Sequence, residues 1–331
     1  MPSINTTLGK MFFQNDDQTV YDAASQADIA LPYSCKTGRC SSCKCKVLVG
    51  ESFAKFDEVG LTTEEKAAGW ILSCVRTATS DLLIEVEDLG GVIIPPVKTL
   101  PAKIGSMEKL APDVLHISLK LPPTSSFDYL SGQYVDVIGA GGVRRSYSIA
   151  NWPAADKKLD LHIRAVTGGV MSDYWFNTAK VGDLVRINGP LGSFFLRDVA
   201  GLDLVFLATG TGIAPVQAIL GDLQQLEAVQ RPRSVAVLWG GRFPQDMYID
   251  VKSIPGDHHF VPVLSRPNIG WFGAHGHVQQ ALLDIEPDLS NSAVYACGSD
   301  AMIHSARDIL LQKGLPSNRF YSDAFVCSRA N

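Results

Sequence analysis

Hydrophobic and polar residues alternate through the middle of the chain, between turns rich in proline and glycine. The alternation is clearest at residues 114–119, 134–138 and 159–163. Short strands at this spacing, about six of them here, are typical of an antiparallel barrel. The pattern therefore predicts an antiparallel β-barrel domain over residues 102–200.

The hydrophobic pattern changes after residue 200. Four apolar runs alternate with helical patterns: 204–208, 235–239, 260–264 and 294–297. Strands that are apolar on both faces, with helices between them, are typical of a parallel sheet covered by helices. Residues 201–331 are therefore predicted to form an α/β parallel-sheet domain. Its helix over 300–313 is expected to begin after Ser299 and to end at Gly314.

The first 90 residues show short strand-like runs and one small helix. Thr62 and Glu65 have the spacing of a capping box, and Gly69 provides a helix stop. Cys45 opens an alternating run, which predicts a strand residue that faces a small core. Residues 91–101 contain three prolines and are predicted to form a linker with some stiffness.

Composition and charge narrow the class of protein. A chain of 331 residues suits two or three domains, and 46% hydrophobic residues are typical of a soluble globular protein. The N-terminal sequence has no basic segment followed by an apolar one, so we expect a cytoplasmic protein without a membrane anchor. Residues 1–90 hold 8 Lys+Arg and 13 Asp+Glu, whereas the remainder holds 21 of each. This acidity disfavours nucleic acid as a partner, and either steers a basic protein partner or serves solubility.

Four cysteines near the N-terminus carry the clearest chemical signal. Cys35, Cys40 and Cys43 lie in a single loop, and Cys74 follows 31 residues later. This C-x4-C-x2-C spacing with a distant fourth cysteine is that of plant-type 2Fe–2S ferredoxins. Structural zinc, which is the alternative, usually takes its thiolates as two close pairs in the sequence. The spacing favours a 2Fe–2S cluster and a β-grasp-like ferredoxin domain over residues 1–90.

Two short sequences point to nucleotide cofactors. In the barrel, Arg145 offers donors for a diphosphate, Tyr147 offers a flat ring for a flavin, and Ser148 offers a hydroxyl. Gly168 and Gly169 are expected to open a helix near a phosphate. In the last domain, the sequence TGTGIAP follows the first strand, and Cys297-Gly298 ends another; both positions suit a dinucleotide at a parallel sheet. Each signal alone is weak, and Cys297 also fits a buried strand-end thiol.

Their order along the chain resembles the ferredoxin–NADP reductase superfamily, in the subgroup with an N-terminal plant-type ferredoxin domain. The sequences VRRSYSIAN, GVMSDYWFN, YACGSDAMI and NRFYSDAFV are most similar to the CDP-6-deoxy-L-threo-D-glycero-4-hexulose-3-dehydrase reductase family. The resemblance implies that Cys35, Cys40, Cys43 and Cys74 ligate the cluster. It further implies that FAD is bound by Arg145, Tyr147, Ser148, His162, Gly169, Met171 and Ser172. The nicotinamide nucleotide would be bound by Gly210, Thr211, Gly212 and Gly298.

The resemblance also implies a reaction. Electrons would pass from NADH, or from NADPH, to FAD, then to the 2Fe–2S cluster, then to a partner protein. Ser148 and Cys297 would lie beside the reacting centres, and Phe325 would cover the flavin, although six residues follow Phe325 here. The implied partner is a sugar dehydrase that carries a pyridoxamine cofactor. The alternative is an oxygenase component, and a redox carrier without a specific partner is a third class.

Overall fold

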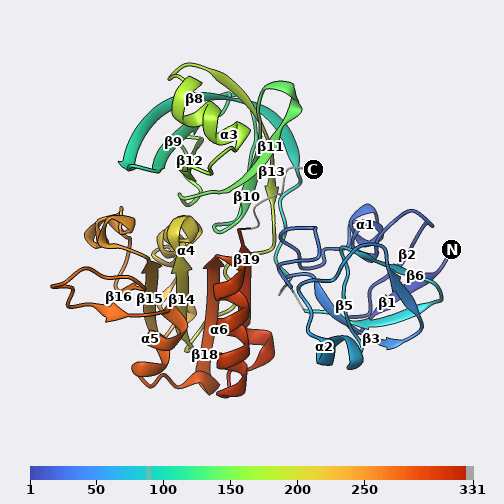
Figure 1. Cartoon of the computed structure of the whole chain (residues 1–331). Helices are drawn as coiled ribbons and strands as arrows, with labels where there is room; N and C mark the ends of the chain where they lie inside the picture. Colours follow the sequence, from blue (N-terminus) through green and yellow to red (C-terminus); the bar gives the residue numbers. More distant parts are fainter. Residues whose placement is uncertain (88, 90, 326–331) are drawn as a thin grey trace. The chain divides into compact units, whose positions relative to one another are not determined.

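The computed structural model describes residues 1–87, 89 and 91–325. The chain divides into two compact units (Figure 1). Of the described residues, the first unit contains Met1–Ile93, Gly192–Arg197 and 322–325, and the second contains Ile94–Leu191 and Asp198–Tyr321. Each unit is described separately below. The predicted boundaries of three domains and a linker stay predictions.

The first unit is built on a mixed sheet with strand order β2-β1-β7-β3-β5. Strands β1 and β7 pair in parallel, and the other neighbours pair antiparallel. Helix α1 packs its apolar side into the core of this unit, as a β-grasp fold requires. The elements are β1 (Ser3–Thr6), β2 (Met11–Phe13), α1 (Val20–Gln26), β3 (Lys44–Val49), β5 (Trp70–Leu72) and β7 (Leu82–Glu85), with β4 (Ser52–Ala54) and β6 (Arg76–Ala78) as a separate pair.

The small helix expected near residue 62 is α2 (Thr63–Ala67). The Thr62 hydroxyl accepts a hydrogen bond from the Glu65 amide, and the Glu65 carboxylate accepts one from the Thr62 amide. This capping box is the one predicted, and Gly69 follows the helix at a φ of +85°. Cys45 lies in β3 and is only 2% exposed, which confirms its core position.

The second unit begins with a six-stranded antiparallel sheet, in the order β11-β10-β13-β8-β9-β12. A bridge between Ile149 and Leu161 joins the two edges of this sheet and closes the predicted barrel. Its strands are β8 (Lys98–Ala111), β9 (Val114–Lys120), β10 (Tyr134–Ile138), β11 (Arg144–Ser148), β12 (Lys158–Arg164) and β13 (Leu184–Leu191). One turn of helix, α3 (Val170–Asp173), begins directly after Gly169, and the π-helix η2 (Tyr174–Thr178) continues it.

Strand β8 begins at Lys98, so the last four residues of the expected linker lie in the barrel. Pro101 has no amide hydrogen and is one of the three prolines that suggested a linker over residues 91–101. In the structure Pro101 lies opposite Arg186 of β13, and Leu100 and Ala102 pair with Ile187 and Val185. Pairing on both sides of the proline keeps this segment in the sheet.

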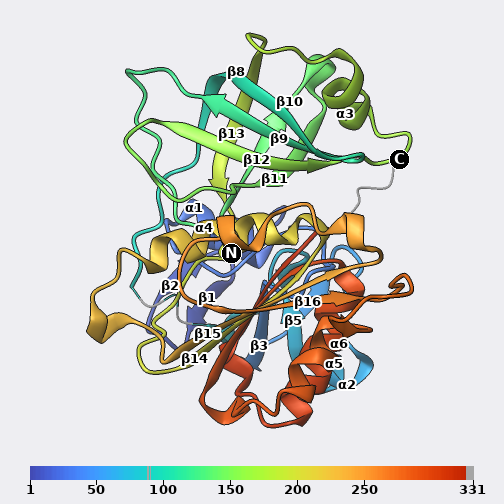
Figure 2. The same cartoon turned by 90° about the vertical axis from the view of Figure 1, so that its left-hand side faces the viewer.

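The remaining sheet has the order β17-β16-β15-β14-β18-β19. Strands β14 to β18 pair in parallel, and β19 begins in the second unit, whereas its residues from Ser322 belong to the first. Figure 2 shows α4 on one face of this sheet and α5 with α6 on the other. The elements are β14 (Asp203–Thr209), α4 (Ile213–Leu223), β15 (Ser234–Gly241), β16 (His259–Leu264), β17 (Ala274–His275), α5 (Val278–Asp284), β18 (Ser292–Gly298), α6 (Asp300–Gln312) and β19 (Phe320–Ala324). Ser299 caps α6, as expected, by accepting a hydrogen bond from the Met302 amide.

Short 3-10 helices complete the second unit: η1 (Ala140–Gly142), η3 (Gly210–Gly212), η4 (Ala228–Gln230), η5 (Pro244–Asp246), η6 (Val251–Ser253), η7 (Leu289–Asn291) and η8 (Ser317–Arg319). The strand order reverses between β14 and β18, because β15, β16 and β17 lie on one side and β19 on the other. In open α/β sheets, ligands bind beyond the carboxyl ends of the strands at such a point. Among the described helices, none has the length and apolar character needed to cross a membrane.

Candidate functional site

The four predicted cysteine ligands lie together in the first unit as two pairs. The Sγ atoms of Cys43 and Cys74 are 3.2 Å apart, and Cys40 contacts Cys35. Backbone amides point at the sulfurs, because the Cys35 amide donates to Cys40 Sγ at 3.4 Å and the Thr37 amide to Cys35 Sγ at 3.4 Å. Cys40, Cys43 and Cys74 are buried, and Cys35 is partly exposed.

Each pair of thiols is arranged to share a proton. The hydrogen bond from Cys40 lowers the pKa of Cys35 to about 5, and the same contact raises the pKa of Cys40. The hydrogen bond between Cys43 and Cys74 raises the pKa of Cys43 and lowers that of Cys74. Thiolate is the form that binds iron, and these shifts favour that form at Cys35 and Cys74.

This donor set fits a two-iron cluster. In such a cluster each iron takes two cysteine thiolates, and the structure presents two pairs of thiols with amides directed at the sulfurs. Within the described residues, no three His, Cys, Asp or Glu side chains gather as a single metal ion would require.

The shape of the cysteine loop depends on Gly38. This residue has a φ of +74°, and a Cβ atom there would lie 2.4 Å from the Asp57 carbonyl oxygen. The Gly60 amide donates to the Gly38 carbonyl, and the Ser41 hydroxyl donates to the Gly60 carbonyl. Segment 57–60 therefore packs directly on the loop and leaves no room for a side chain at Gly38.

The predicted flavin residues lie on β11, at one edge of the barrel sheet. Tyr147 accepts a hydrogen bond from Trp175 Nε1 at 3.1 Å, and burial raises the pKa of its hydroxyl to about 12. Ser148 is buried and lies opposite Tyr134 of β10. Arg145 is partly exposed, and its Nη1 donates to the Arg144 carbonyl at 2.7 Å. The guanidinium has further N–H donors, whose fixed geometry suits a diphosphate.

The glycine turn before α3 brings a second group of predicted flavin residues to the barrel. The Ser172 hydroxyl accepts a hydrogen bond from the Val166 amide at 2.8 Å, which fixes the turn around Gly169. Met171 is buried against Gly139, where a Cβ atom would lie 2.6 Å from its sulfur. Met171 and Ser172 thus have structural contacts in addition to the roles expected of them.

His162 lies on β12 within a cluster that sequence reasoning did not identify. Its ring packs edge-on against His116 and against Tyr248, and Tyr248 Oη is 3.3 Å from His162 Nδ1. Burial, together with a smaller effect of the nearby His116, lowers the pKa of His162 to about 3. His162 is therefore a neutral ring at neutral pH, with one nitrogen that donates a hydrogen bond and one that accepts.

The predicted nucleotide residues meet where the strand order reverses. Ala208 of β14 lies directly beside Cys297 of β18, so the TGTG turn and the Cys297-Gly298 pair occupy neighbouring strand ends. A Cβ atom on Gly212 would lie 2.2 Å from the Cys297 carbonyl oxygen, and one on Gly298 would lie 2.1 Å from Thr209 Oγ1. The Ser299 amide donates to Thr209 Oγ1 at 3.0 Å. These glycines allow two backbones to approach closely at the expected binding edge.

Arg164 is a further candidate that the sequence analysis missed. It ends β12, and its Nη1 would lie 2.9 Å from a Cβ atom on Gly210. Its Nη2 is buried and has no hydrogen-bond partner among the described residues. No sequence signal marks Arg164, because its position beside the glycine turn depends on how the barrel and the parallel sheet pack in the second unit.

Cys297 is fully buried, and Phe325 lies just after β19 and is partly buried. The six residues that follow Phe325, and their effect on how it covers the flavin, lie outside the described residues.

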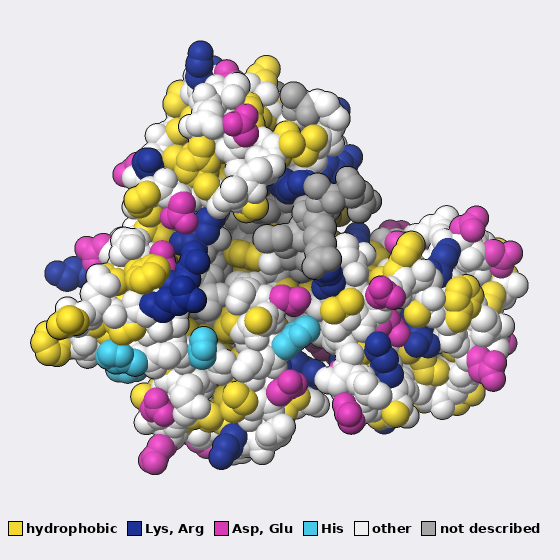
Figure 3. Space-filling model, viewed as in Figure 1, with side chains coloured by type: hydrophobic (Ala, Val, Ile, Leu, Met, Phe, Trp, Pro, Cys, Tyr) yellow, Lys and Arg dark blue, Asp and Glu magenta, His cyan; other side chains and the backbone are white. Residues whose placement is uncertain are grey.

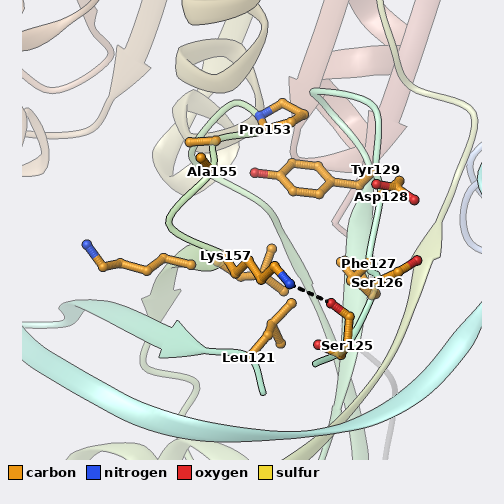
Figure 4. Close-up of a pocket in the computed structure, with 12 residues that line it drawn as sticks. Leu121, Ser125, Ser126, Phe127, Asp128, Tyr129, Pro153, Ala155 and Lys157 are labelled. Atoms are coloured by element: carbon orange, nitrogen blue, oxygen red, sulfur yellow. Dashed lines mark hydrogen bonds between the residues drawn. The ribbon is translucent and has the colours of Figure 1, made fainter. Parts of the chain in front are cut away.

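A cavity of about 450 Å³ lies elsewhere in the barrel, between the segment 121–129 and the segment 153–159 (Figure 4). Lys157 crosses it and donates to the Ser125 carbonyl at 3.0 Å. None of the residues predicted to bind a cofactor lines this cavity. The predicted cofactor sites therefore lie at the strand ends and the cysteine loop, and not in this cavity.

Comparison with known proteins agrees with this arrangement. Three family models match: the 2Fe-2S iron-sulfur cluster binding domain over residues 6–79, the oxidoreductase FAD-binding domain over 101–196 and the oxidoreductase NAD-binding domain over 206–308. The CDP-6-deoxy-L-threo-D-glycero-4-hexulose-3-dehydrase reductase of Yersinia pestis is 41% identical over 99% of this chain and 100% of its own.

Reductase components of oxygenase systems are similar as well. Reductase component 1 of the terephthalate 1,2-dioxygenase of a Comamonas species is 32% identical over 94% of this chain and 93% of its own. Among solved structures, the cytochrome P450 reductase GcoB of Amycolatopsis has a TM-score of 0.74 and 29% identity, and the match covers 98% of this chain and 99% of that one.

Proposed function

We propose that the electron acceptor of this protein is a CDP-6-deoxyhexulose 3-dehydrase. The chain belongs to the family of reductases with 2Fe–2S, FAD and NAD domains, which includes the CDP-6-deoxy-L-threo-D-glycero-4-hexulose-3-dehydrase reductases. The observation that supports this proposal is the 41% identity, which extends over 99% of this chain and the whole relative. A pyridoxamine-bearing dehydrase that makes a 3,6-dideoxysugar would then receive the electrons.

The alternative acceptor is an oxygenase component. The terephthalate dioxygenase reductase and the P450 reductase support it, because both cover nearly the whole chain at about 30% identity. The difference of about ten percentage points in identity favours the dehydrase. NADH is the proposed donor, and NADPH remains the alternative.

Cys35, Cys40, Cys43 and Cys74 are the proposed cluster ligands, and each pair would hold one iron. Bound together in a protein, a flavin and a 2Fe–2S cluster convert the two electrons of a hydride donor into single electrons at low potential. The chain's part is to hold these groups and to set their surroundings. The amides of Cys35 and Thr37, which point at sulfur, would stabilise the charge on the thiolates.

FAD would be held by the barrel and covered from the C-terminal side. Arg145 would bind the diphosphate, Tyr147 would lie against the flavin ring, and the Ser148 hydroxyl would hydrogen-bond it. Gly169, Met171, Ser172 and His162 would line the remainder of the cofactor, and Phe325 would cover the ring. Support comes from the common placement of these barrel residues on β11, β12 and the turn before α3.

The nicotinamide nucleotide would bind at the neighbouring ends of β14 and β18. Gly210, Thr211, Gly212 and Gly298 would let its phosphates approach the backbone, and Cys297 would lie beside the nicotinamide. Support comes from the reversal of strand order at this edge and from the close packing that the glycines permit.

Anaerobic spectroscopy tests the proposal. Addition of NADH should bleach the flavin band and produce the EPR signal of a reduced 2Fe–2S cluster. Addition of a purified CDP-6-deoxyhexulose 3-dehydrase with its substrate should then return both centres to the oxidised state. If an oxygenase component reoxidised them and the dehydrase did not, the alternative acceptor would be correct.

Cys74→Ser tests the ligand assignment. The variant should lose the EPR signal of the cluster but retain FAD and its bleaching by NADH, because the barrel residues proposed to hold FAD lie in the second unit. Cys45→Ser is the matched control, since Cys45 is a buried core cysteine of the same unit. If Cys45→Ser abolished the signal and Cys74→Ser did not, the proposed ligand set would be wrong.

A further inference from the structure

Two segments from distant parts of the sequence belong to the first unit and contact the cysteine loop. One is Gly192–Arg197, which continues from the last residue of β13, and the other begins at Ser322 in β19. The residues before Cys35 and before Cys43 make hydrogen bonds to these segments. The cysteine loop is therefore held by chain that leads, along the backbone, directly to the elements proposed to hold and cover the flavin.

The first of these contacts joins Ser193 to Tyr33. The Tyr33 amide donates to Ser193 Oγ at 2.8 Å, the Ser193 amide donates to the Tyr33 carbonyl at 2.9 Å, and Ser193 Oγ also lies 2.9 Å from that carbonyl. The two residues thus interact through backbone and side chain. Tyr33 is two residues from Cys35, and Ser193 is two residues from Leu191.

Leu191 connects this contact with the proposed flavin residues. In the barrel sheet Leu191 lies opposite Tyr134, and Tyr134 lies opposite Ser148 on its other side. A continuous series of covalent and hydrogen-bonded contacts therefore runs from Ser148 across two strands to Leu191, then through Ser193 to Tyr33 and on to Cys35.

The second contact joins the loop to the C-terminal segment. The Ser34 hydroxyl donates to the Asp323 carboxylate, and both side chains are buried, at 3% and 4% exposure. The Ser42 hydroxyl donates to the Ser322 carbonyl at 2.9 Å. Ser34 directly precedes Cys35, and Asp323 is two residues before Phe325. Buried polar groups of this kind are costly to leave without partners, so the contact holds the loop firmly.

We propose that Ser193 and Ser34, through their hydrogen bonds to Tyr33 and Asp323, are positioning residues for the transfer of single electrons into the cysteine loop. The inference rests on the proposed function. The step concerned moves one electron from the reduced flavin to the oxidised cluster, and no bond is formed or broken. Loss of these contacts would let the loop move away from the segments that lead to the flavin, and small displacements of this kind slow such steps strongly.

Stopped-flow spectroscopy of the complete protein separates the two steps. In Ser193→Ala and Ser34→Ala, bleaching of the flavin by NADH should keep its rate, whereas reduction of the cluster should become about tenfold to a hundredfold slower. Ser193→Thr keeps the hydroxyl, and Asp323→Asn keeps an oxygen that accepts a hydrogen bond. Both variants should therefore retain most of the wild-type rate of cluster reduction. Ser234→Ala is the matched control, because it removes another serine–aspartate hydrogen bond, to Asp203, away from the loop.

Hydrogen exchange gives a readout that does not depend on turnover. Without NADH, residues 33–43 should exchange faster in Ser193→Ala and Ser34→Ala than in the wild type, and should be unchanged in Ser234→Ala. The EPR signal of the dithionite-reduced protein should show an intact cluster in all variants.

Three outcomes would overturn the inference: unchanged cluster reduction in both alanine variants, equal slowing of both steps, or loss of the cluster itself. The last outcome would place these contacts in cluster assembly. If the wild type bleached its flavin but never reduced a cluster, the proposed function would fail. If the wild type reduced its cluster and the variants matched it, only this inference would fail.

Discussion

Arg164 illustrates at the residue scale how a partly buried cation can indicate a ligand. Its Nε lies 3.3 Å from the Asp113 carboxylate, while Nη2 is buried without a hydrogen-bond partner among the described residues. A buried donor without a partner is costly, so a group that binds there gains affinity from satisfying it. The guanidinium lies against Gly210, in the turn proposed to approach a dinucleotide. A phosphate oxygen is the ligand that suits these donors best.

Substitution of Arg164 by glutamine should weaken binding of the nicotinamide nucleotide. We expect Arg164→Gln to raise KM for NADH by about tenfold, the loss of one charged hydrogen bond, and to change kcat little. Steady-state reduction of ferricyanide measures both constants, and the flavin content of the purified variant serves as the control. If the variant loses flavin and keeps its KM, Arg164 holds the other cofactor.

His162 makes stability depend on pH. Its pKa is about 3 in the folded protein, against an ordinary value near 6.5, so the unfolded chain binds a proton that the folded protein excludes. Stability should therefore fall as the pH decreases from about 6.5 towards 3. His116 and Asp160 face the same ring from β9 and β12, and Tyr248 contacts it from the parallel-sheet side. We expect the melting temperature of His162→Asn to fall less between pH 7 and pH 5 than that of the wild type; parallel curves would contradict this expectation.

At the scale of elements, helix α2 links a local sequence signal to the cysteine site. Its capping box satisfies the first free amides of a helix only five residues long. The helix is followed by β5, which ends at Leu72, two residues before Cys74. The helix thus helps to define where Cys74, the proposed fourth ligand, enters the core.

Thr62→Ala should destabilise the first unit by about 1 kcal/mol, the usual effect of losing an N-cap. Chemical denaturation followed by absorbance of the cluster should show an earlier loss of colour than in the wild type. Thr63→Ala is the matched control, because Thr63 is exposed and lies inside the helix. Equal midpoints for Thr62→Ala and the wild type would show that the cap contributes little to this unit.

Elements with a clear local pattern could be predicted from the sequence. Alternation predicted β9, β10 and β12, and uninterrupted apolar runs predicted β14, β15, β16 and β18, because these periodicities reflect which faces are buried. The three prolines of residues 91–101 gave no local sign of the strand that begins at Lys98, since the cost of a proline in a sheet depends on the partner strand. The contacts of Arg164, Ser193 and Asp323 join residues far apart in the sequence, and no local pattern encodes such pairings.

At the scale of the whole molecule, charge is distributed unevenly along the chain. Residues 1–90 carry a net charge of −5 and the remaining residues a net charge of zero. Figure 3 shows the Asp and Glu side chains of the first unit spread around its visible surface and not gathered in one patch. If this charge steers a basic partner, attraction over a broad area favours rapid encounter over tight binding in one orientation.

Electron transfer to a basic protein acceptor should therefore depend on salt. With cytochrome c as the acceptor, we expect the second-order rate constant to fall as the ionic strength rises from about 0.01 M to 0.15 M, because the Debye length shrinks from about 30 Å to 8 Å. The rate of flavin bleaching by NADH, measured under the same conditions, is the control. A cytochrome c rate that does not change with salt would assign the acidity to solubility.

The assembly of the first unit from three separate stretches of chain has a consequence for protein engineering. A fragment that ends at Ile93 would contain all four cysteines but would lack the partners of Tyr33, Ser34 and Ser42. A chimera made by exchanging residues 1–93 between homologues would inherit mismatched partners from its recipient. Grafting of this module therefore requires that Gly192–Arg197 and the chain from Ser322 be exchanged with it.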